Sequence, residues 1–297
     1  MIPFLVSIVA AALYSVAGAR LYVALGAHER SGAGLAPERA APPPASPSRD
    51  ADPVDVRRLP AVRGRRVTLA IALAALVLHA ALVWVQTGLP HALRLPFFTA
   101  LDLVALGVAA LLVVLCLTRP ADYLGLAVYP LAAVVVLASQ AVHDPVPVRA
   151  QAVEIHVLLS VLAYAVLALA AAQSVLVQVQ RRFLSAHRPG GFLNALPPLE
   201  STESLLFALL GAGFALLTLS LASGFFYLED MFAQHLVHKT VLSSAAWLLF
   251  GALLFGRWRF GWRGRRAVAW TLGGYALLLL AYFGSKLVLE LVLGRGA

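Results

Sequence analysis

Charged residues are scarce in this chain of 297 residues. Asp, Glu, Lys and Arg together make up 12% of it, and 61% of its residues are hydrophobic. A soluble domain of this length carries about twice that charged fraction, roughly a quarter of its residues. The composition therefore excludes an ordinary soluble protein and predicts an integral membrane protein whose first partner is the lipid bilayer.

Cysteine and the common catalytic motifs are also missing. Cys116 is the single cysteine, so the chain forms no internal disulfide, and the absence of Cys-x-x-Cys-His excludes covalently attached c-type haem. The chain has no glycine-rich phosphate loop, no His-Glu-x-x-His and no Gly-x-Ser-x-Gly. Nor is there a series of carboxylates of the kind that proton-driven pumps use. We therefore expect no bond-making chemistry and classify the protein as a non-enzyme.

Long apolar runs are what the sequence has in abundance. A membrane helix needs roughly 20 mainly apolar residues, and eight segments meet this requirement. The sequence therefore predicts an all-α polytopic membrane protein with eight transmembrane helices. The predicted spans are Ile2–Leu25, Val67–Gln86, Phe97–Leu117, Tyr123–Ala141, Ala152–Gln178, Thr202–Tyr227, Leu236–Phe255 and Ala267–Leu293.

The predicted organisation has three parts. Residues 1–25 form a first transmembrane helix, which we expect to be retained, because Arg20 directly follows the small residues that mimic a signal-peptidase site. Residues 26–66 are rich in Pro, Ala, Ser and Arg and cannot bury a core, so they predict a disordered cytoplasmic loop. Residues 67–297 form a seven-helix membrane core.

The basic residues predict the orientation. If the chain crosses the membrane at each span, the 23 Lys and Arg residues divide unequally between the two sides. The poorer side has Arg94, Arg149, Lys239, Lys286 and Arg295, and the richer side has all the others. The positive-inside rule places the richer side in the cytoplasm and both termini outside. It also accounts for the net charge of +9 without nucleic acid as a partner.

Polar chemistry is concentrated between residues 225 and 239, where aromatic and acidic residues precede His238 and Lys239. His156 begins another apolar segment, with Ser160 and Tyr164 on the same helical face. We expect these two histidines to line one polar pocket at the outer face. Two imidazoles from different helices suit axial ligation of a planar metal macrocycle, and they equally suit a hydrogen-bonded link between helices.

His79 lies inside the second predicted span. An ionisable side chain at membrane depth is costly, faces the bundle interior and is a functional candidate by default. The alternative is a neutral imidazole that bridges two helices, and the sequence leaves both interpretations open.

Three stretches resemble the CcsA/CcmC-like cytochrome c assembly proteins, and in particular their YpjD-like inner-membrane branch. They are the helix opening at His156, the block from Ser223 to Trp247, and the closing run from Gly261 to Lys286. The resemblance covers roughly residues 67–294. It implies a multi-pass protein of the bacterial inner membrane that holds haem between histidines at the outer face for transfer to apocytochrome c.

The resemblance implies non-covalent haem b and matches His156 to an outer ligand histidine. We take His238 as the second candidate iron ligand, and His238 or His79 could substitute for the ligands that are missing. The outer loop has Phe225 and Phe226 but no tryptophan-rich motif, and Lys286 stands near where other members carry a second histidine. The main hypothesis is therefore a haem-binding or haem-handling protein, with periplasmic or membrane proteins as further partners. The alternatives are a non-haem scaffold or partner subunit of the same fold, and a small-solute transporter.

Overall fold

The computed structural model describes residues 2–33, 60–87, 97–141, 154–186, 196–227 and 237–284. All regular structure in these ranges is helical, as the composition predicts, and eight helices are long and apolar enough to cross a membrane. The elements are α1 (Ile2–Ala33), α2 (Pro60–Thr87), α3 (Phe97–Thr118), a 3-10 turn η2 (Asp122–Leu124), α4 (Gly125–Ala141), α5 (Glu154–Ser185), α6 (Leu199–Tyr227), α7 (Val237–Phe260), α8 (Arg265–Leu279) and a π-helical turn η5 (Leu280–Gly284).

Several helices extend beyond the predicted apolar spans. Helix α1 continues to Ala33 and α2 begins at Pro60, so both ends of the segment predicted as a disordered loop are helical. A helix satisfies its own backbone hydrogen bonds and need not stop where the apolar stretch stops. Proline suits the first helical position, where its missing N–H has no intrahelical partner to lose. The remainder of that loop, residues 34–59, lies outside the described residues.

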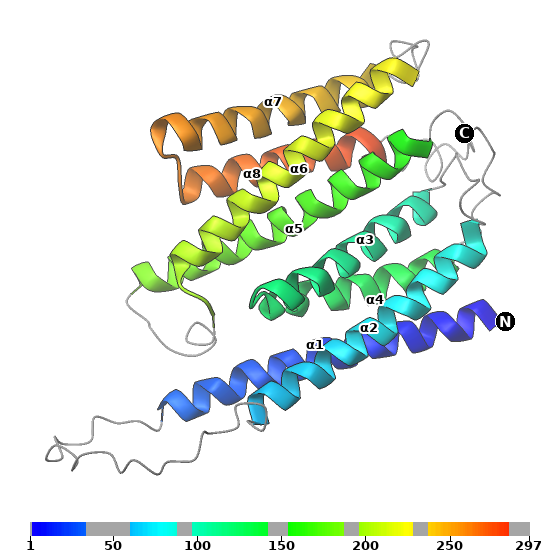
Figure 1. The fold of residues 1–297 in the computed structure, drawn as a ribbon, viewed down its shortest axis with the longest axis vertical. Coiled ribbons are helices and arrows are strands. Elements are labelled where there is room, and N and C mark those ends of the chain that lie inside the picture. Colours follow the sequence, from blue (N-terminus) through cyan, green and yellow to red (C-terminus); the bar gives the residue numbers. More distant parts are fainter. Residues whose placement is uncertain are drawn as a thin grey trace, which may run out of the picture.

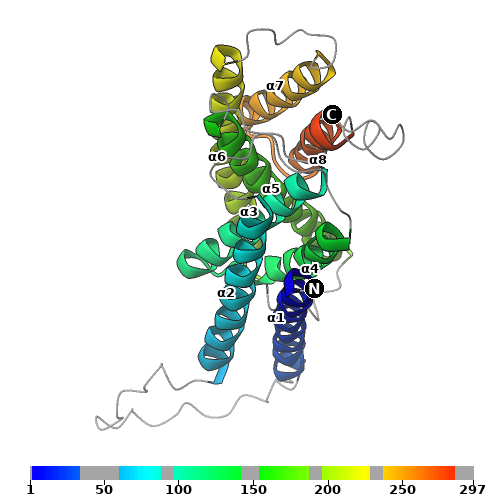
Figure 2. The ribbon, with the colours of Figure 1, turned by 90° about the vertical axis from the view of Figure 1, so that its right-hand side faces the viewer.

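The bundle has two halves, each with its own apolar core. One core joins α1, α2, α3 and α4, and the other joins α5, α6, α7 and α8. Figure 1 shows the two halves one above the other, with α3 and α5 running along the boundary, and Figure 2 shows the same bundle from the side. A small aromatic cluster that includes Phe97 of α3 and Phe283 of η5 connects the halves at one end.

Small residues let α5 and α6 pack closely along their length. A Cβ atom added at Gly213 would come 2.6 Å from the side chain of Leu167, and one at Gly224 would come 3.1 Å from the ring of His156. Such close approach is how helices associate in lipid, where no hydrophobic force drives one apolar helix against another. It also brings polar groups of the two helices within hydrogen-bond reach.

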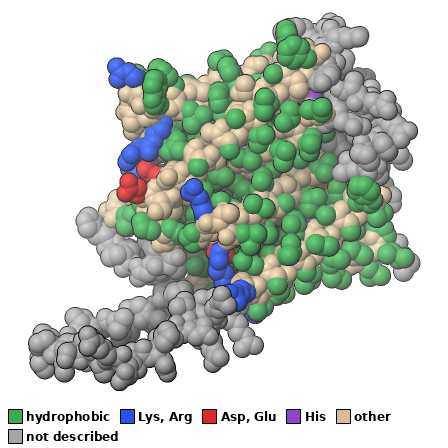
Figure 3. Space-filling view, viewed as in Figure 1, with side chains coloured by type: hydrophobic (Ala, Val, Ile, Leu, Met, Phe, Trp, Pro, Cys, Tyr) green, Lys and Arg blue, Asp and Glu red, His purple; other side chains and the backbone are tan. Residues whose placement is uncertain are grey.

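Exposed Lys and Arg side chains gather at one end of the bundle, the left side in Figure 3. This is the end where α1, α5 and α7 finish and where α8 begins with Arg265. Helix α1 begins and the π-helical turn η5 ends at the opposite end of the bundle (Figure 1). The assignment of the basic end to the cytoplasm remains a prediction from the positive-inside rule.

Candidate functional site

A cavity of about 250 Å³ lies at the less basic end of the bundle. Its walls come from α3, α5, α6, α7 and η5, so it sits where the two halves meet. The residues on which the argument depends are His156, Ser160, Ser220, Lys239, Tyr282 and Phe283. Most of the remaining lining is apolar. A largely apolar cavity with a few convergent polar groups is the usual form of a small-molecule site, although this one is slightly below the common range of roughly 300–1,000 Å³.

The imidazole of His156 is held by α6. Its Nδ1 lies 2.9 Å from the backbone carbonyl oxygen of Ser220 and 3.1 Å from the hydroxyl of Ser223. A carbonyl oxygen only accepts hydrogen bonds, so Nδ1 carries the proton and donates it. In the neutral ring, Nε2 then has the lone pair. This is the tautomer that a histidine adopts when its other nitrogen binds a metal.

A second hydrogen-bonded layer supports this arrangement. The hydroxyl of Ser160 donates to the carbonyl oxygen of His156 at 2.7 Å, and its oxygen lies 2.7 Å from the hydroxyl of Ser220. Gly224 supplies the space in which the His156 ring lies, because any side chain there would meet it. Ser220 and Gly224 are small residues four positions apart, a spacing that favours close helix packing. Both also line the cavity.

Aromatic residues form the wall opposite α6. The hydroxyl of Tyr164 donates to the carbonyl oxygen of Leu278 at 2.7 Å and thereby attaches α5 to α8 directly before the π-helical turn. Tyr282 and Phe283 of that turn pack edge to face at 5.2 Å, and the ammonium of Lys239 lies 5.8 Å from the centre of the Tyr282 ring. Single π-helical turns occur often at functional sites, and here one brings two aromatic rings to the cavity, beside the ammonium of Lys239 from α7.

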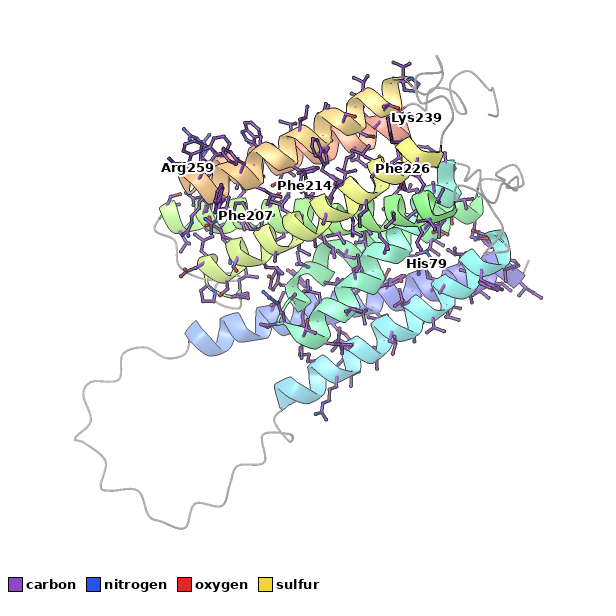
Figure 4. All side chains as sticks on the ribbon, turned by 45° about the horizontal axis from the view of Figure 1, so that its top comes forward. His79, Phe207, Phe214, Phe226, Lys239 and Arg259 are labelled. Carbon is purple, nitrogen blue, oxygen red and sulfur yellow. The ribbon has the colours of Figure 1, made fainter. Side chains whose placement is uncertain are left out.

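The structure does not bring the other predicted site residues to this cavity. His238 is exposed near the start of α7 and is not among the lining residues, whereas its neighbour Lys239 is. Phe225 and Phe226 of the predicted polar stretch are 70% and 81% exposed. Figure 4 shows Phe226 and Lys239 at the same end of the bundle, on α6 and α7. The rest of the predicted polar loop, residues 228–236, lies outside the described residues.

His79 belongs to a different site in the other half of the bundle. Its side chain is fully buried, and both ring nitrogens have polar partners, the hydroxyl of Tyr14 at 3.3 Å and Asp102 Oδ1 at 3.0 Å. The contacts of His79 therefore match its interpretation as an imidazole that bridges helices. Sequence reasoning missed Asp102, although an acid within an otherwise apolar span is a recognisable signal.

The cavity offers one imidazole and no cluster of metal ligands. Within the described ranges, no group of three or more His, Cys, Asp or Glu side chains is placed to hold a metal ion. The site could therefore accept a ligand whose metal ion is already largely coordinated and can take one further imidazole nitrogen. It could also accept an apolar ligand with an acidic group that pairs with Lys239. The fold and this site define a polytopic helical membrane protein with an imidazole-lined cavity near one membrane face.

The chain belongs to the cytochrome c assembly protein family, whose profile matches residues 67–293. It is 38% identical over 141 residues to the inner membrane protein YpjD of Escherichia coli K12, a match covering 46% of this chain and 52% of that protein. An uncharacterised 28.8 kDa protein of Azospirillum brasilense is 39% identical over 144 residues, covering 48% and 53% of the two chains.

More distant relatives are cytochrome c biogenesis proteins CcsA. The protein of Prochlorococcus marinus (strain NATL1A) is 28% identical over 103 residues, which cover 32% of this chain and 33% of that protein. The chain thus spans about half the length, or less, of the curated relatives it matches. No solved structure matches it significantly. Eight spans together with the inner-membrane relatives identify a multi-pass protein of the bacterial inner membrane.

Proposed function

We propose that this protein binds haem non-covalently as haem b at the outer face of the inner membrane and takes part in its handling during cytochrome assembly. The observation that carries the proposal is the fixed tautomer of His156, whose Nδ1–H donates to the Ser220 carbonyl and whose Nε2 keeps its lone pair. Family membership supports the same class of function. The role we assign is binding and transfer, without catalysis of a reaction by this chain.

The residues of the cavity fit part of such a ligand. Haem supplies an iron whose axial position accepts a neutral imidazole nitrogen, and His156 offers one. Tyr282 and Phe283 offer aromatic surface, and Lys239 offers a positive charge that would complement a carboxylate group. The cavity of about 250 Å³ would hold one edge of the macrocycle rather than enclose all of it. A ligand held in this way would keep an accessible edge for transfer to a partner membrane or periplasmic protein.

One observation favours a second candidate function, a non-haem scaffold or partner subunit that retains the family fold. Only one of the three predicted ligand histidines lines the cavity, since His79 and His238 lie elsewhere. A scaffold would use the same hydrogen bonds between His156 and α6 to fix helix packing. The two candidates differ in one measurable property, which is whether the purified protein binds haem.

The test is an absorption spectrum of the detergent-purified protein, as isolated and after haem addition. We expect a Soret band in the wild type and a weaker one in His156→Ala. Removing a hydrogen-bond partner of a metal ligand typically lowers affinity roughly 10–100-fold. Removing the ligand His156 itself should lower haem affinity at least as much. His238→Ala is the matched control, because that side chain is exposed outside the cavity. A colourless wild type that takes up no added haem, or equal binding by His156→Ala, would favour the scaffold.

A further inference from the structure

A second polar site lies in the half of the bundle that contributes only α3 to the cavity. Tyr14 of α1, His79 of α2 and Asp102 of α3 form a continuous hydrogen-bonded row, with 3.3 Å between the Tyr14 hydroxyl and His79 Nδ1 and 3.0 Å between His79 Nε2 and Asp102 Oδ1. Tyr14 and His79 are 0% exposed and Asp102 is 1% exposed. Helices far apart in sequence thus place an acid, a base and a phenol side by side within an apolar core (Figure 4 labels His79).

The surroundings of Asp102 decide how many protons the row holds. Its second oxygen, Oδ2, is buried and has no hydrogen-bond partner among the residues that the structure describes. An ionised Asp102 beside a neutral His79 would leave a net negative charge in an apolar region, with one carboxylate oxygen unpaired, which is strongly unfavourable. One proton on the pair removes the net charge, whether it resides on the carboxyl group or on the imidazole. The buried pair is therefore most stable when it holds a single proton.

We propose that Tyr14, His79 and Asp102 form a membrane-buried proton-binding site, separate from the cavity, in which the His79–Asp102 pair binds one exchangeable proton. The ligand of this site is the proton itself. Its transfer between Asp102 and His79 leaves the number of protons on the pair unchanged. When the carboxyl group gives its proton to Nε2, the pair becomes imidazolium and carboxylate, and Nδ1–H then donates to the Tyr14 oxygen. When the proton returns to Asp102 Oδ1, Nε2 of the neutral His79 accepts from the carboxyl group, and Nδ1–H still donates to the Tyr14 oxygen.

The other titratable groups that carry contacts in this half are Tyr129, which packs against the row, and a group at the far end of α3. Tyr129 of α4 stacks on Tyr14 with ring centres 5.9 Å apart. Arg65 and Asp122 pair with each other at 2.9 Å, and Arg65 also donates to the carbonyl of Cys116 near the far end of α3 from Asp102. A second proton, or loss of the first, would therefore place an uncompensated charge between α1, α2 and α3.

Infrared spectroscopy of the full chain in lipid nanodiscs tests the proposal. At neutral pH we expect either a protonated-carboxyl band or an imidazolium band, shifted in D₂O, that is lost in Asp102→Asn. Asp122→Asn is the matched control, because that acid is partly exposed and paired with Arg65, and it should leave the band unchanged. A wild type with neither band, or a band that persists in Asp102→Asn, would overturn the proposal.

Two further variants keep the test decisive if Asp102→Asn does not fold. His79→Gln removes the base while retaining a side chain that can hydrogen-bond, so the band should shift or disappear; an unchanged band contradicts a shared proton. Tyr14→Phe keeps the ring that stacks on Tyr129 and removes only the hydroxyl. It should shift the band, since Nδ1 loses its partner, and an unshifted band removes Tyr14 from the site. Both readouts are independent of haem.

Discussion

The imidazole of His156 owes its orientation to the neighbouring helix. The Ser220 carbonyl accepts from Nδ1–H, the Ser223 hydroxyl donates to the same carbonyl at 2.7 Å, and Gly224 leaves room for the ring. None of these residues is itself a candidate ligand. They act through His156, because a ring held in one tautomer and one orientation loses less entropy when it binds a metal.

A side chain at Gly224 should therefore disturb haem binding by displacing the His156 ring, although Gly224 itself is no ligand. In Gly224→Leu the new side chain would occupy the space of the His156 ring, and we expect a loss of haem affinity of roughly 10–100-fold, as for other outer partners of metal ligands. Haem titration followed by absorbance measures this. Gly211→Leu, on the same helix but with nothing within 4 Å of the added Cβ atom, is the control. Equal losses in both variants would contradict the assigned role of Gly224.

At the scale of elements, the contact between α5 and α6 supports the whole C-terminal half. Gln173 of α5 donates to the carbonyl of Thr202 at 2.8 Å, and the Thr202 hydroxyl donates to the Gln180 side-chain oxygen at 2.8 Å. Arg181 pairs with Glu203 at 3.3 Å at the same end. The two helices are thus joined by polar contacts near both ends and by close apolar packing between them.

Widening this contact should destabilise the protein. In Gly213→Ala the methyl group would lie 2.6 Å from Leu167, so the side chain or the helix must shift. Overpacking of this kind costs about 1–3 kcal/mol of unfolding free energy. Thermal unfolding in detergent should show a lowered midpoint, whereas Gly273→Ala, where nothing lies within 4 Å, should change it little. An unchanged midpoint in Gly213→Ala would indicate that α5 and α6 separate without cost.

At the scale of the whole molecule, the distribution of charge predicts the orientation of the bundle. The basic end and the cavity end are opposite ends of the same helices. If the basic end faces the cytoplasm, the cavity opens toward the periplasm, where apocytochromes are found. The function proposed for the cavity depends on this orientation.

Reporter fusions test the orientation directly. Alkaline phosphatase fused after residue 297 should be active, because the C-terminus is predicted to lie outside, and a fluorescent protein fused there should be dark. The same reporters inserted in the predicted cytoplasmic segment 34–59 should give the opposite result. Phosphatase activity in that segment would place the cavity in the cytoplasm and contradict transfer of haem at the outer face.

The sequence by itself determined the membrane class, the eight spans and the candidacy of His156. Runs of about 20 apolar residues have no other stable environment, and a histidine that opens an apolar helix with Ser160 and Tyr164 below it is visible as a pattern. The helix ends were less well predicted, because α1 continues to Ala33 and α2 begins at Pro60, beyond the apolar spans.

Only the tertiary structure decided which polar groups meet. His156 finds its partner in a backbone carbonyl of Ser220, 64 residues away, and His79 finds Asp102 on a different helix. Nearly uniform apolar composition hides which face of each helix points inward, so spacing along the chain cannot pair residues on separate helices. The rotation and packing of the helices determine which residues meet. They place His156 at the cavity, and His79 and His238 away from it.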